Sequence, residues 1–206
     1  RVKGNYRYRL HVSFITIIAL FVLITNNVLA ASEKINLREH KSSIIPKLDK
    51  QTNNNKSLSI STQSADKNRS QLRDAVGLTA EDTLRETGST TDKSGKTHKR
   101  YQQYHRGLAV WGHQASVHSD AAGSIENLNG SILRSIGQDV QSLQASVSVE
   151  RAIQIAEMTH AEKTKTAASA WELRNTRHEL IIFDDAKGTA ALAYLIEIAA
   201  VNIQSG

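Results

Sequence analysis

The sequence contains no cysteine, a single proline and few aromatic residues, and each shortage excludes some classes of protein. Without cysteine the chain cannot form disulfides, thiolate metal sites or a cysteine nucleophile. A single proline and 22% charged residues argue against fibrous, collagenous and multispan membrane proteins. The hydrophobic fraction of 39% is enough for one ordinary domain or two small ones in a chain of 206 residues. We therefore expect a soluble protein stabilised by its own apolar core.

Acidic residues are absent from the first 30 positions, where Arg1, Lys3, Arg7 and Arg9 all lie. The formal net charge of the whole chain is +6, and it falls to +2 without these four side chains. A nearly balanced remainder gives no electrostatic reason to bind nucleic acid or an acidic membrane. The start at Arg1 rather than Met is consistent with an incomplete gene product.

The longest apolar run follows this basic start, from Leu10 to Leu23, and it leads to the small residues Ala30 and Ala31. A basic start, an apolar core and a small-residue cleavage site are the three parts of a secretory signal peptide. We predict a signal peptide over residues 1–31, cleavage after Ala30 or Ala31, and a secreted or periplasmic product. The alternative is a membrane anchor, because the run is barely long enough to cross about 30 Å of hydrocarbon.

Residues 32–70 have few apolar side chains, and Ser42 to Ser70 is rich in Ser, Asn, Lys, Gln and Thr. Such a segment cannot bury enough apolar surface to offset the entropy of ordering. We predict that residues 32–70 form a flexible linker and that the folded region begins near Gln71.

The spacing of apolar residues changes several times after Gln71, which predicts a mixture of helices and antiparallel strands. One helix should end at Gly77, and Ser148 is a good N-cap for another. Two strands joined by His105-Arg106-Gly107 should form a hairpin, and the next strand needs a bulge near Asn127 to keep its apolar residues on one face. The expected strands are 97–104, 108–118, 124–136, 171–174, 179–183 and 190–201.

No alternation of long helices and parallel strands is present, which argues against a nucleotide-binding α/β fold. We predict an α+β fold with two small subdomains, residues 71–138 and 139–206. Each should be an antiparallel sheet with a packed helix.

The eight histidines are the most obvious candidates for metal binding or catalysis. No His-Glu-x-x-His pair occurs, which would place two imidazoles and a general base on one helical face. His113 and His118 are five residues apart in an expected strand, so they should face opposite sides. His118-Ser119-Asp120 contains the residue types of a triad, but sequence neighbours rarely have triad geometry. We predict no catalytic, cofactor-binding or metal site, and interpret these histidines, including His98 and His105, as surface or packing residues.

Other conspicuous residues are interpreted as structural. Gly107 and Gly112 are backbone requirements, and Trp111 is a core residue. Asp184 and Asp185 are adjacent in a glycine-bearing turn, so they are more easily interpreted as turn residues than as a catalytic carboxylate pair.

Arg100, Tyr101, Gln102 and Tyr104 form a polar and aromatic group in the strand 97–104. Arg and Tyr are common anchors of protein interfaces, so one interpretation is a protein-binding surface. The other is a half-solvated sheet whose side chains pair across strands. The residues themselves leave both interpretations open.

Two runs carry a family resemblance, Val76–Leu84 (VGLTAEDTL) and Asp92–Gly112 (DKSGKTHKRYQQYHRGLAVWG). With a following V-x-x-D-x-x-G turn, they resemble the fungalysin/thermolysin propeptide domain. Residues 148–201 resemble the PepSY domain that follows it in such precursors. Ala109 departs from the usual Pro of the motif, and His113 from a second Gly. The motif or interface positions are His98, Arg100, Tyr101, Gln102, Tyr104, Gly107, Val110, Gly112, Asp120 and Gly123.

The resemblance implies a propeptide that assists the folding of a thermolysin-like zinc metalloprotease and keeps it inactive until processing. The partner would be the catalytic domain, in cis or in trans, and the zinc would belong to that domain. One alternative is a freestanding secreted protease inhibitor or PepSY-type binding protein. Another is a small histidine-dependent metal-binding enzyme, which would show tight zinc binding or turnover. A downstream His-Glu-x-x-His would support the precursor, and a stop codon the freestanding protein.

Overall fold

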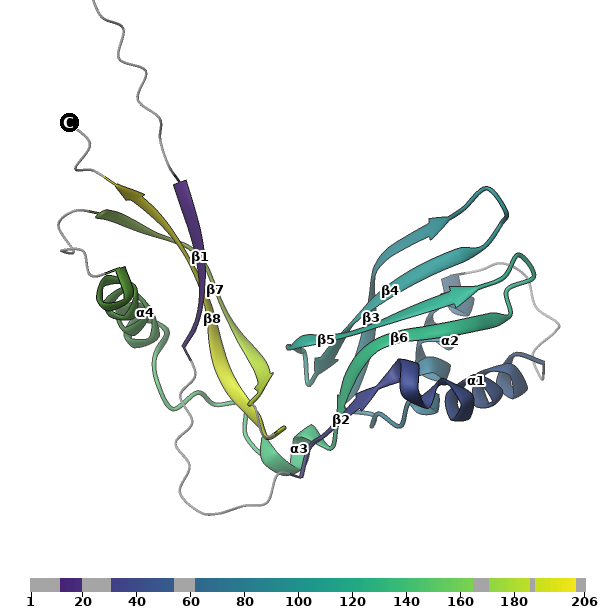
Figure 1. The fold of residues 1–206 in the computed structure, drawn as a ribbon. Coiled ribbons are helices and arrows are strands. Elements are labelled where there is room, and N and C mark those ends of the chain that lie inside the picture. Colours follow the sequence, from purple (N-terminus) through teal and green to yellow (C-terminus); the bar gives the residue numbers. More distant parts are fainter. Residues whose placement is uncertain (1–11, 20–30, 54–61, 165–170, 186–187, 203–206) are drawn as a thin grey trace, which may run out of the picture. The chain divides into compact units, whose positions relative to one another are not determined.

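The computed structural model of the chain describes residues 12–19, 31–53, 62–164, 171–185 and 188–202 (Figure 1). The chain divides into two compact units. The larger unit comprises Leu23–Leu143 with Ile181–Ala191; the smaller unit comprises Arg1–Val22, Gln144–Leu180 and Leu192–Gly206. Helices and mostly antiparallel strands make up the described residues, so the predicted α+β class is confirmed. The subdomain boundary expected after residue 138 stays a prediction.

The larger unit is built on a twisted antiparallel sheet of consecutive strands. These are β3 (Asp82–Thr91), β4 (Thr97–His105), β5 (Leu108–Ser119) and β6 (Ile125–Arg134). A short strand, β2 (Glu33–Asn36), pairs antiparallel with β6. Three consecutive hairpin connections therefore produce most of the sheet from one continuous stretch of chain.

The predicted hairpin and bulge are both present in this sheet. Arg106 and Gly107 connect β4 to β5 with φ of 45° and 89°, the positive values that a tight hairpin turn requires. His118 pairs with Asn127 and Ser119 with Ile125, which leaves Glu126 without an opposite residue on β5. This extra residue is the bulge that the apolar pattern predicted near Asn127.

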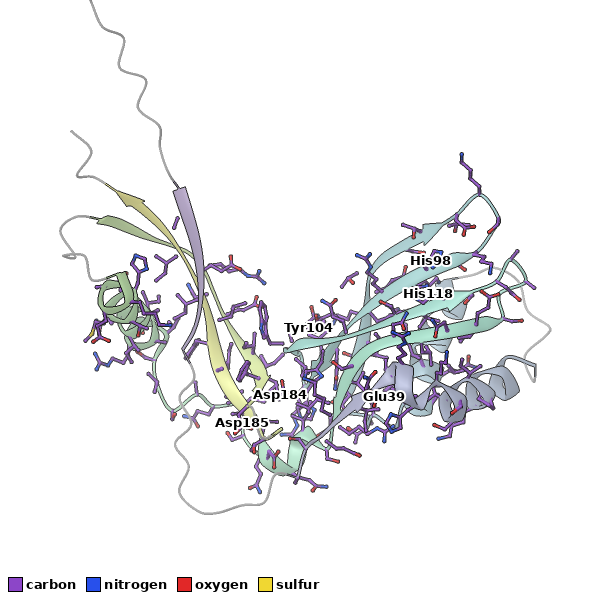
Figure 2. The ribbon with its side chains drawn as sticks, in the orientation of Figure 1. Glu39, His98, Tyr104, His118, Asp184 and Asp185 are labelled. Atoms are coloured by element: carbon purple, nitrogen blue, oxygen red, sulfur yellow. The ribbon has the colours of Figure 1, made fainter. Side chains whose placement is uncertain are left out.

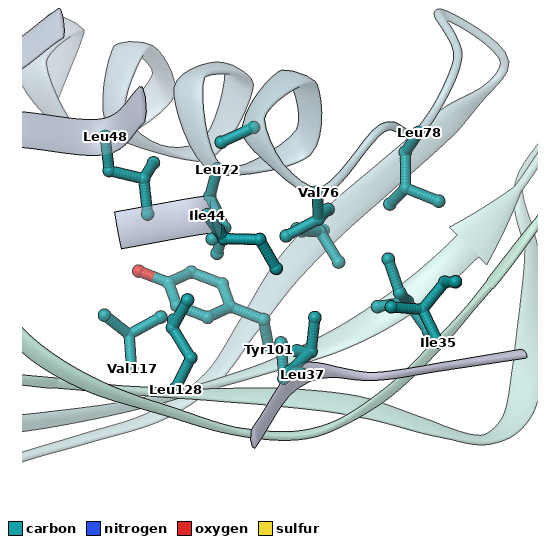
Figure 3. Packing of buried hydrophobic residues seen from close by; sticks show 14 residues of the cluster. Ile35, Leu37, Ile44, Leu48, Leu72, Val76, Leu78, Tyr101, Val117 and Leu128 are labelled. Carbon is teal, nitrogen blue, oxygen red and sulfur yellow. The ribbon is translucent and has the colours of Figure 1, made fainter. Parts of the chain in front are cut away.

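Two helices, α1 (Leu37–Asn53) and α2 (Thr62–Ala75), cover one face of the sheet (Figure 1). The apolar core lies between them and the strands, as Figure 3 shows for residues such as Ile44, Leu72, Tyr101 and Leu128. The predicted helix before Gly77 is confirmed, although it begins earlier than Gln71. Gly77, with φ of 76°, lies just past the end of α2 in the conformation that favours glycine.

Part of the segment expected to be a flexible linker is folded. Residues 33–53 form β2 and α1, and the side chains of Ile35, Leu37, Ile44 and Leu48 are each at most 4% exposed. The last three are separated by seven and four residues, which places them on one face of a helix. The polar composition of the segment concealed this spacing.

The smaller unit contains α4 (Val149–Thr164), the strand β1 (Val12–Ala19) and most of the strands β7 (Trp171–Asp184) and β8 (Ala190–Asn202). The last four residues of β7 and the first two of β8 belong to the larger unit. The predicted Ser148 cap is confirmed, because its hydroxyl accepts a hydrogen bond from the backbone N–H of Arg151. Ala152 and Ala156 of α4 pack against Ile196 and Ile198 of β8. The strands expected at 171–174 and 179–183 are a single strand, β7.

The apolar core of the predicted signal peptide lies partly in β1, which pairs antiparallel with β8 from Val12↔Val201 to Ala19↔Tyr194. Within the described residues, no helix is long and apolar enough to span a membrane. Ala30 lies outside the described residues, and cleavage after Ala30 or Ala31 stays a prediction.

A short helix, α3 (Ile136–Asp139), follows β6 in the larger unit. Asp139 accepts hydrogen bonds from the backbone N–H groups of Ala31, Ser32 and Ala190 at 3.0, 3.0 and 3.1 Å. Burial acts to raise the pKa of Asp139, but these hydrogen bonds outweigh it and the pKa is lowered. One carboxylate thus connects three segments that are far apart in the sequence.

Candidate functional site

The candidate site is the outer face of the larger sheet, defined as the face turned away from α1 and α2. Strand alternation and the pairing register place one set of side chains there in adjacent rows. Two are arginines, and none is an aspartate or glutamate. The outer face consists of Thr83, Arg85, Thr90, His98, Arg100, Gln102, Tyr104, Gln114, Ser116, His118, Asn127, Asn129 and Ser131.

Arg85 and Tyr104 form the aromatic part of the outer face. The guanidinium carbon of Arg85 lies 4.0 Å from the centroid of the Tyr104 ring, in cation–π geometry. Arg100 is exposed in the next row, opposite Ser116. Fixed Arg and Tyr side chains on a rigid sheet are suited to bind another protein, because they contribute large contact areas at a small entropic cost.

A basic edge continues this face at β2 and the start of α1. Lys34, Asn36 and Arg38 line a shallow depression together with Asn129, Gly130 and Ser131. The carboxylate of Glu39 lies nearby and accepts a hydrogen bond from the Asn36 amide at 2.8 Å. The cationic side chains of the outer face and this edge are Arg85, Arg100, Lys34 and Arg38, and Lys34 pairs with Asp184 Oδ2 at 3.5 Å.

Tyr101 is not an outer-face residue, contrary to its interpretation as an interface anchor. It points to the opposite side of β4 from Arg100 and Gln102, and it is 5% exposed within the core. Burial raises the pKa of its phenol to about 12, with a further contribution from Glu86. Trp111 is only half-buried, so it is less of a core residue than we expected.

Gln102 organises a large bulge in β5. Gln102 pairs with Gln114, and Tyr104 pairs with Ala109. Residues 110–113 of β5 therefore all lie opposite a single residue of β4, Gln103. The Gln102 amide nitrogen lies 2.7 to 3.1 Å from the carbonyl oxygens of Gln103, Val110 and His113. Gly112 has φ of 76° within this bulge. Gln102 and Gly112 therefore have a backbone role, which agrees with the interpretation of Gly112.

The bulge brings Val110 and His113 against the end of β7. Val110 is fully buried and pairs in parallel with Ile182. His113 Nε2 donates to Asp184 Oδ1 at 3.0 Å, and its Nδ1 lies 3.5 Å from the Ser131 hydroxyl. Burial lowers the pKa of His113, although the hydrogen bond to Asp184 opposes the shift. A neutral imidazole in this place is a packing residue that connects strands.

His98 and His118 come together across β4 and β5, and Figure 2 shows them side by side. Their Nδ1 atoms are 2.6 Å apart. His113 is buried and His118 is half-buried, and the expectation that the two face opposite sides of β5 stays a prediction.

A buried histidine–carboxylate contact that the sequence did not reveal lies at the other end of β4. His105 Nδ1 is 2.8 Å from Asp82 Oδ1, and both side chains are 2% exposed. Asp82 Oδ2 accepts hydrogen bonds from the Thr79 hydroxyl and backbone N–H at 2.7 and 2.9 Å. The Asp82 carboxylate is thus occupied with structural bonds at the start of β3. Finding this contact from the sequence would have required the pairing register of β3 and β4, which places Asp82 opposite His105.

The remaining motif residues shape turns. Asp120 Oδ1 accepts hydrogen bonds from the backbone N–H groups of Ala122 and Ser124 at 2.9 and 2.8 Å, and Gly123 has φ of 88°. Gly107 completes the β4–β5 turn.

Among the described residues, no group of three or more histidine, aspartate or glutamate side chains could hold a metal ion.

Comparison with known proteins gives a specific match to part of this region. Residues 82–132, from the start of β3 almost to the end of β6, match the Fungalysin/Thermolysin Propeptide Motif. The propeptide resemblance of these residues is therefore confirmed, whereas the PepSY resemblance of residues 148–201 stays a prediction.

Several protease sequences are similar to a longer part of the chain. A thermolysin of Alicyclobacillus acidocaldarius subsp. acidocaldarius is 31% identical over 124 residues, which is 60% of this chain and 22% of the relative. A neutral protease of Vibrio proteolyticus is 33% identical over 104 residues, 50% of this chain and 17% of the relative. A thermostable neutral protease of Geobacillus stearothermophilus is 32% identical over 124 residues, 60% of this chain and 22% of the relative. The matched part thus spans about a fifth of each relative.

Proposed function

We propose that this chain is the propeptide region of a secreted thermolysin-like zinc metalloprotease, and that it acts as intramolecular chaperone and inhibitor of the catalytic domain. The observation that carries the proposal is the propeptide motif over residues 82–132, which coincides with the sheet of the larger unit. Similarity to three proteases over about a fifth of their length supports it.

The outer face is the proposed contact surface. Its Arg85–Tyr104 pair and the exposed Arg100 supply anchors, and these two arginines favour an acidic patch on the partner. A template that binds only the native-like catalytic domain shifts folding toward that form by mass action. If the same contact blocks substrate access, the template also inhibits.

The proposal extends to the parts of the chain outside the motif. Residues 1–31 would direct export and be removed, which leaves Ala31 or Ser32 as the new N-terminus. Residues 139–206 would be the PepSY-like second part of the propeptide. The zinc would be held by the catalytic domain, and this chain would need no cofactor for its own role. Neither nucleic acid nor, after cleavage, a membrane would be a partner.

A freestanding secreted inhibitor would use the same outer face on a protease encoded elsewhere. The DNA sequence that follows the codon of Gly206 separates the two possibilities. An open frame that encodes His-Glu-x-x-His supports the precursor, and a stop codon supports the freestanding inhibitor.

Refolding tests the chaperone role. A thermolysin-like catalytic domain without its propeptide is denatured and diluted into buffer, alone or with an equimolar amount of the 206-residue chain. We expect the chain to raise the yield of active protease severalfold once it is removed by proteolysis. An equal yield with and without the chain, across several thermolysin-like domains, would rule out this role.

A further inference from the structure

The strand pairing brings His98 and His118 into direct contact on the outer face. They are opposite residues of β4 and β5, with ring centroids 4.9 Å apart and ring planes at 70° (Figure 2). Both side chains are partly exposed, so solutes can reach them. The 2.6 Å separation of the Nδ1 atoms requires one of them to donate a proton and the other to accept it.

The neighbours of the pair determine which nitrogen carries the proton. The Asn129 amide nitrogen, a donor, lies 3.1 Å from His118 Nε2, so this Nε2 accepts and the proton of His118 is on Nδ1. His118 Nδ1 then donates to His98 Nδ1. The proton of His98 is consequently on Nε2, which faces Asp92 Oδ2 at 3.8 Å. Asn129, His118 and His98 are thus linked at hydrogen-bond distances, with the two Nδ1 atoms in contact, and Asp92 lies beyond hydrogen-bond distance of His98.

This arrangement has the outer partners that histidine metal ligands usually possess. A ligating imidazole generally donates its second N–H to a carboxylate or carbonyl, which fixes the ring orientation. Asp92 lies on that side of His98, with Oδ2 at 3.8 Å from Nε2, and would have to move closer to accept this N–H. Its other oxygen, Oδ1, is held by the N–H groups of Ser94 and Lys96 at 2.8 and 3.0 Å. Asn129 lies next to Nε2 of His118. If its side-chain amide turned by half a rotation, the amide oxygen would face this nitrogen and could accept its N–H.

The Nδ1 separation is close to the value that a shared metal ion requires. Two nitrogens bound at about 2.0 Å with a right angle between them are about 2.8 Å apart, and tetrahedral geometry requires about 3.3 Å. For the right-angled case the Nδ1 atoms would move apart by only a few tenths of an ångström, and both rings would turn so that their lone pairs point at the ion and not at each other. Right-angled coordination by nitrogen is typical of Cu²⁺ and Ni²⁺, and Cu²⁺ binds most tightly of the divalent first-row ions.

We propose that His98 and His118 form a two-imidazole binding site for a divalent transition metal, with Cu²⁺ preferred. On binding, the proton of His118 moves from Nδ1 to Nε2, the Asn129 amide turns to accept it, and both Nδ1 lone pairs bind the ion. Water fills the remaining positions. Because two side chains supply all the protein ligands, the ion is exchangeable, with a dissociation constant on the order of 10 μM. The site is independent of the proposed propeptide role.

Titration of the 206-residue chain, prepared without a histidine tag, with Cu²⁺ tests the site. Calorimetry measures affinity and stoichiometry, and electron paramagnetic resonance reports the number of bound nitrogens. We expect one strong site with two imidazole nitrogens. His98→Ala and His118→Ala should each weaken binding at least tenfold, and Asp92→Asn severalfold. His40→Ala, a change of an exposed histidine on α1, is the matched control and should leave the affinity unchanged.

Unchanged circular dichroism in each variant ensures that weaker binding is not a loss of fold. The site would be refuted if the wild-type chain binds Cu²⁺ no tighter than about 1 mM, roughly a hundredfold weaker than the expected dissociation constant. Equal affinity in wild type, His98→Ala and His118→Ala would refute it as well, since the ion would then be bound elsewhere.

Discussion

Gly130 shows how a single residue sets the geometry of the sheet. It pairs with Ala115 on the neighbouring strand and has φ of 97°. A Cβ atom at this position would overlap the carbonyl oxygen of Gln114. Both the backbone conformation and the close approach of β5 therefore require glycine.

Gly130→Ala should destabilise the larger unit by roughly 3 kcal/mol, because it adds a steric overlap to the cost of positive φ. Gly123→Ala is the matched control, since Gly123 has φ of 88° but a Cβ atom added there would meet no other atom within 4 Å. The control should cost only about 1 kcal/mol. Urea denaturation measures both. Equal losses would show that β5 does not approach Gly130 as closely as described.

The contribution of Asp139 to the stability of the folded chain should depend on pH. Its pKa is lowered in the folded chain, so its stabilising contribution is present above the unfolded pKa of about 3.9 and is lost as the pH falls through the folded pKa. Asp139→Asn should therefore cost roughly 1 kcal/mol at pH 7, and this cost should shrink as the pH falls through the folded pKa. Thermal melts across this pH range measure the difference. A cost that does not change with pH would contradict the assigned role.

At the scale of elements, α1 is the part of the larger unit that differs most from expectation. Ile44→Ala should destabilise the unit by about 3 kcal/mol, because Ile44 is 2% exposed in the core. Lys47→Ala, an exposed position on the same helix, should change stability by less than about 0.5 kcal/mol. If the urea concentration at the midpoint of unfolding is the same for both variants and the wild type, residues 37–53 do not pack on the sheet and are a linker.

Local patterns predicted the elements that depend on local rules. The β4–β5 hairpin follows from alternating residues around Arg106-Gly107, and the Ser148 cap follows from helix chemistry. The β6 bulge near Asn127 was predictable because the apolar residues of one strand were out of phase. These features need only a few neighbouring residues to be specified.

Features that depend on distant residues were not predictable. The β5 bulge is stabilised by the Gln102 amide, and a strand pattern does not show which carbonyls that amide reaches. His113 and Asp184 are 71 positions apart, so their hydrogen bond follows only from the parallel pairing of Val110 with Ile182. The same applies to His98 and His118, whose contact requires the register of β4 on β5.

At the scale of the whole molecule, four cationic side chains lie on the outer face and its basic edge, namely Arg85, Arg100, Lys34 and Arg38. The formal charge of +6 is mostly elsewhere, because Arg1, Lys3, Arg7 and Arg9 account for four of the six charges. The helix-covered face of the same sheet is apolar and filled. A partner of the sheet is therefore expected to meet the outer face, and complementary charge would speed and orient the encounter.

The inhibition constant of the 206-residue chain against a folded thermolysin-like catalytic domain is the most direct test of the central claim. We predict stoichiometric inhibition that weakens at least thirtyfold when Arg85 and Arg100 are both changed to Glu, equivalent to about 2 kcal/mol. Changing Lys41 and Lys47, exposed on α1, to Glu should leave the constant within threefold of wild type. Absence of inhibition by the wild-type chain would contradict the claim, and equal inhibition by all three chains would move the contact away from the outer face.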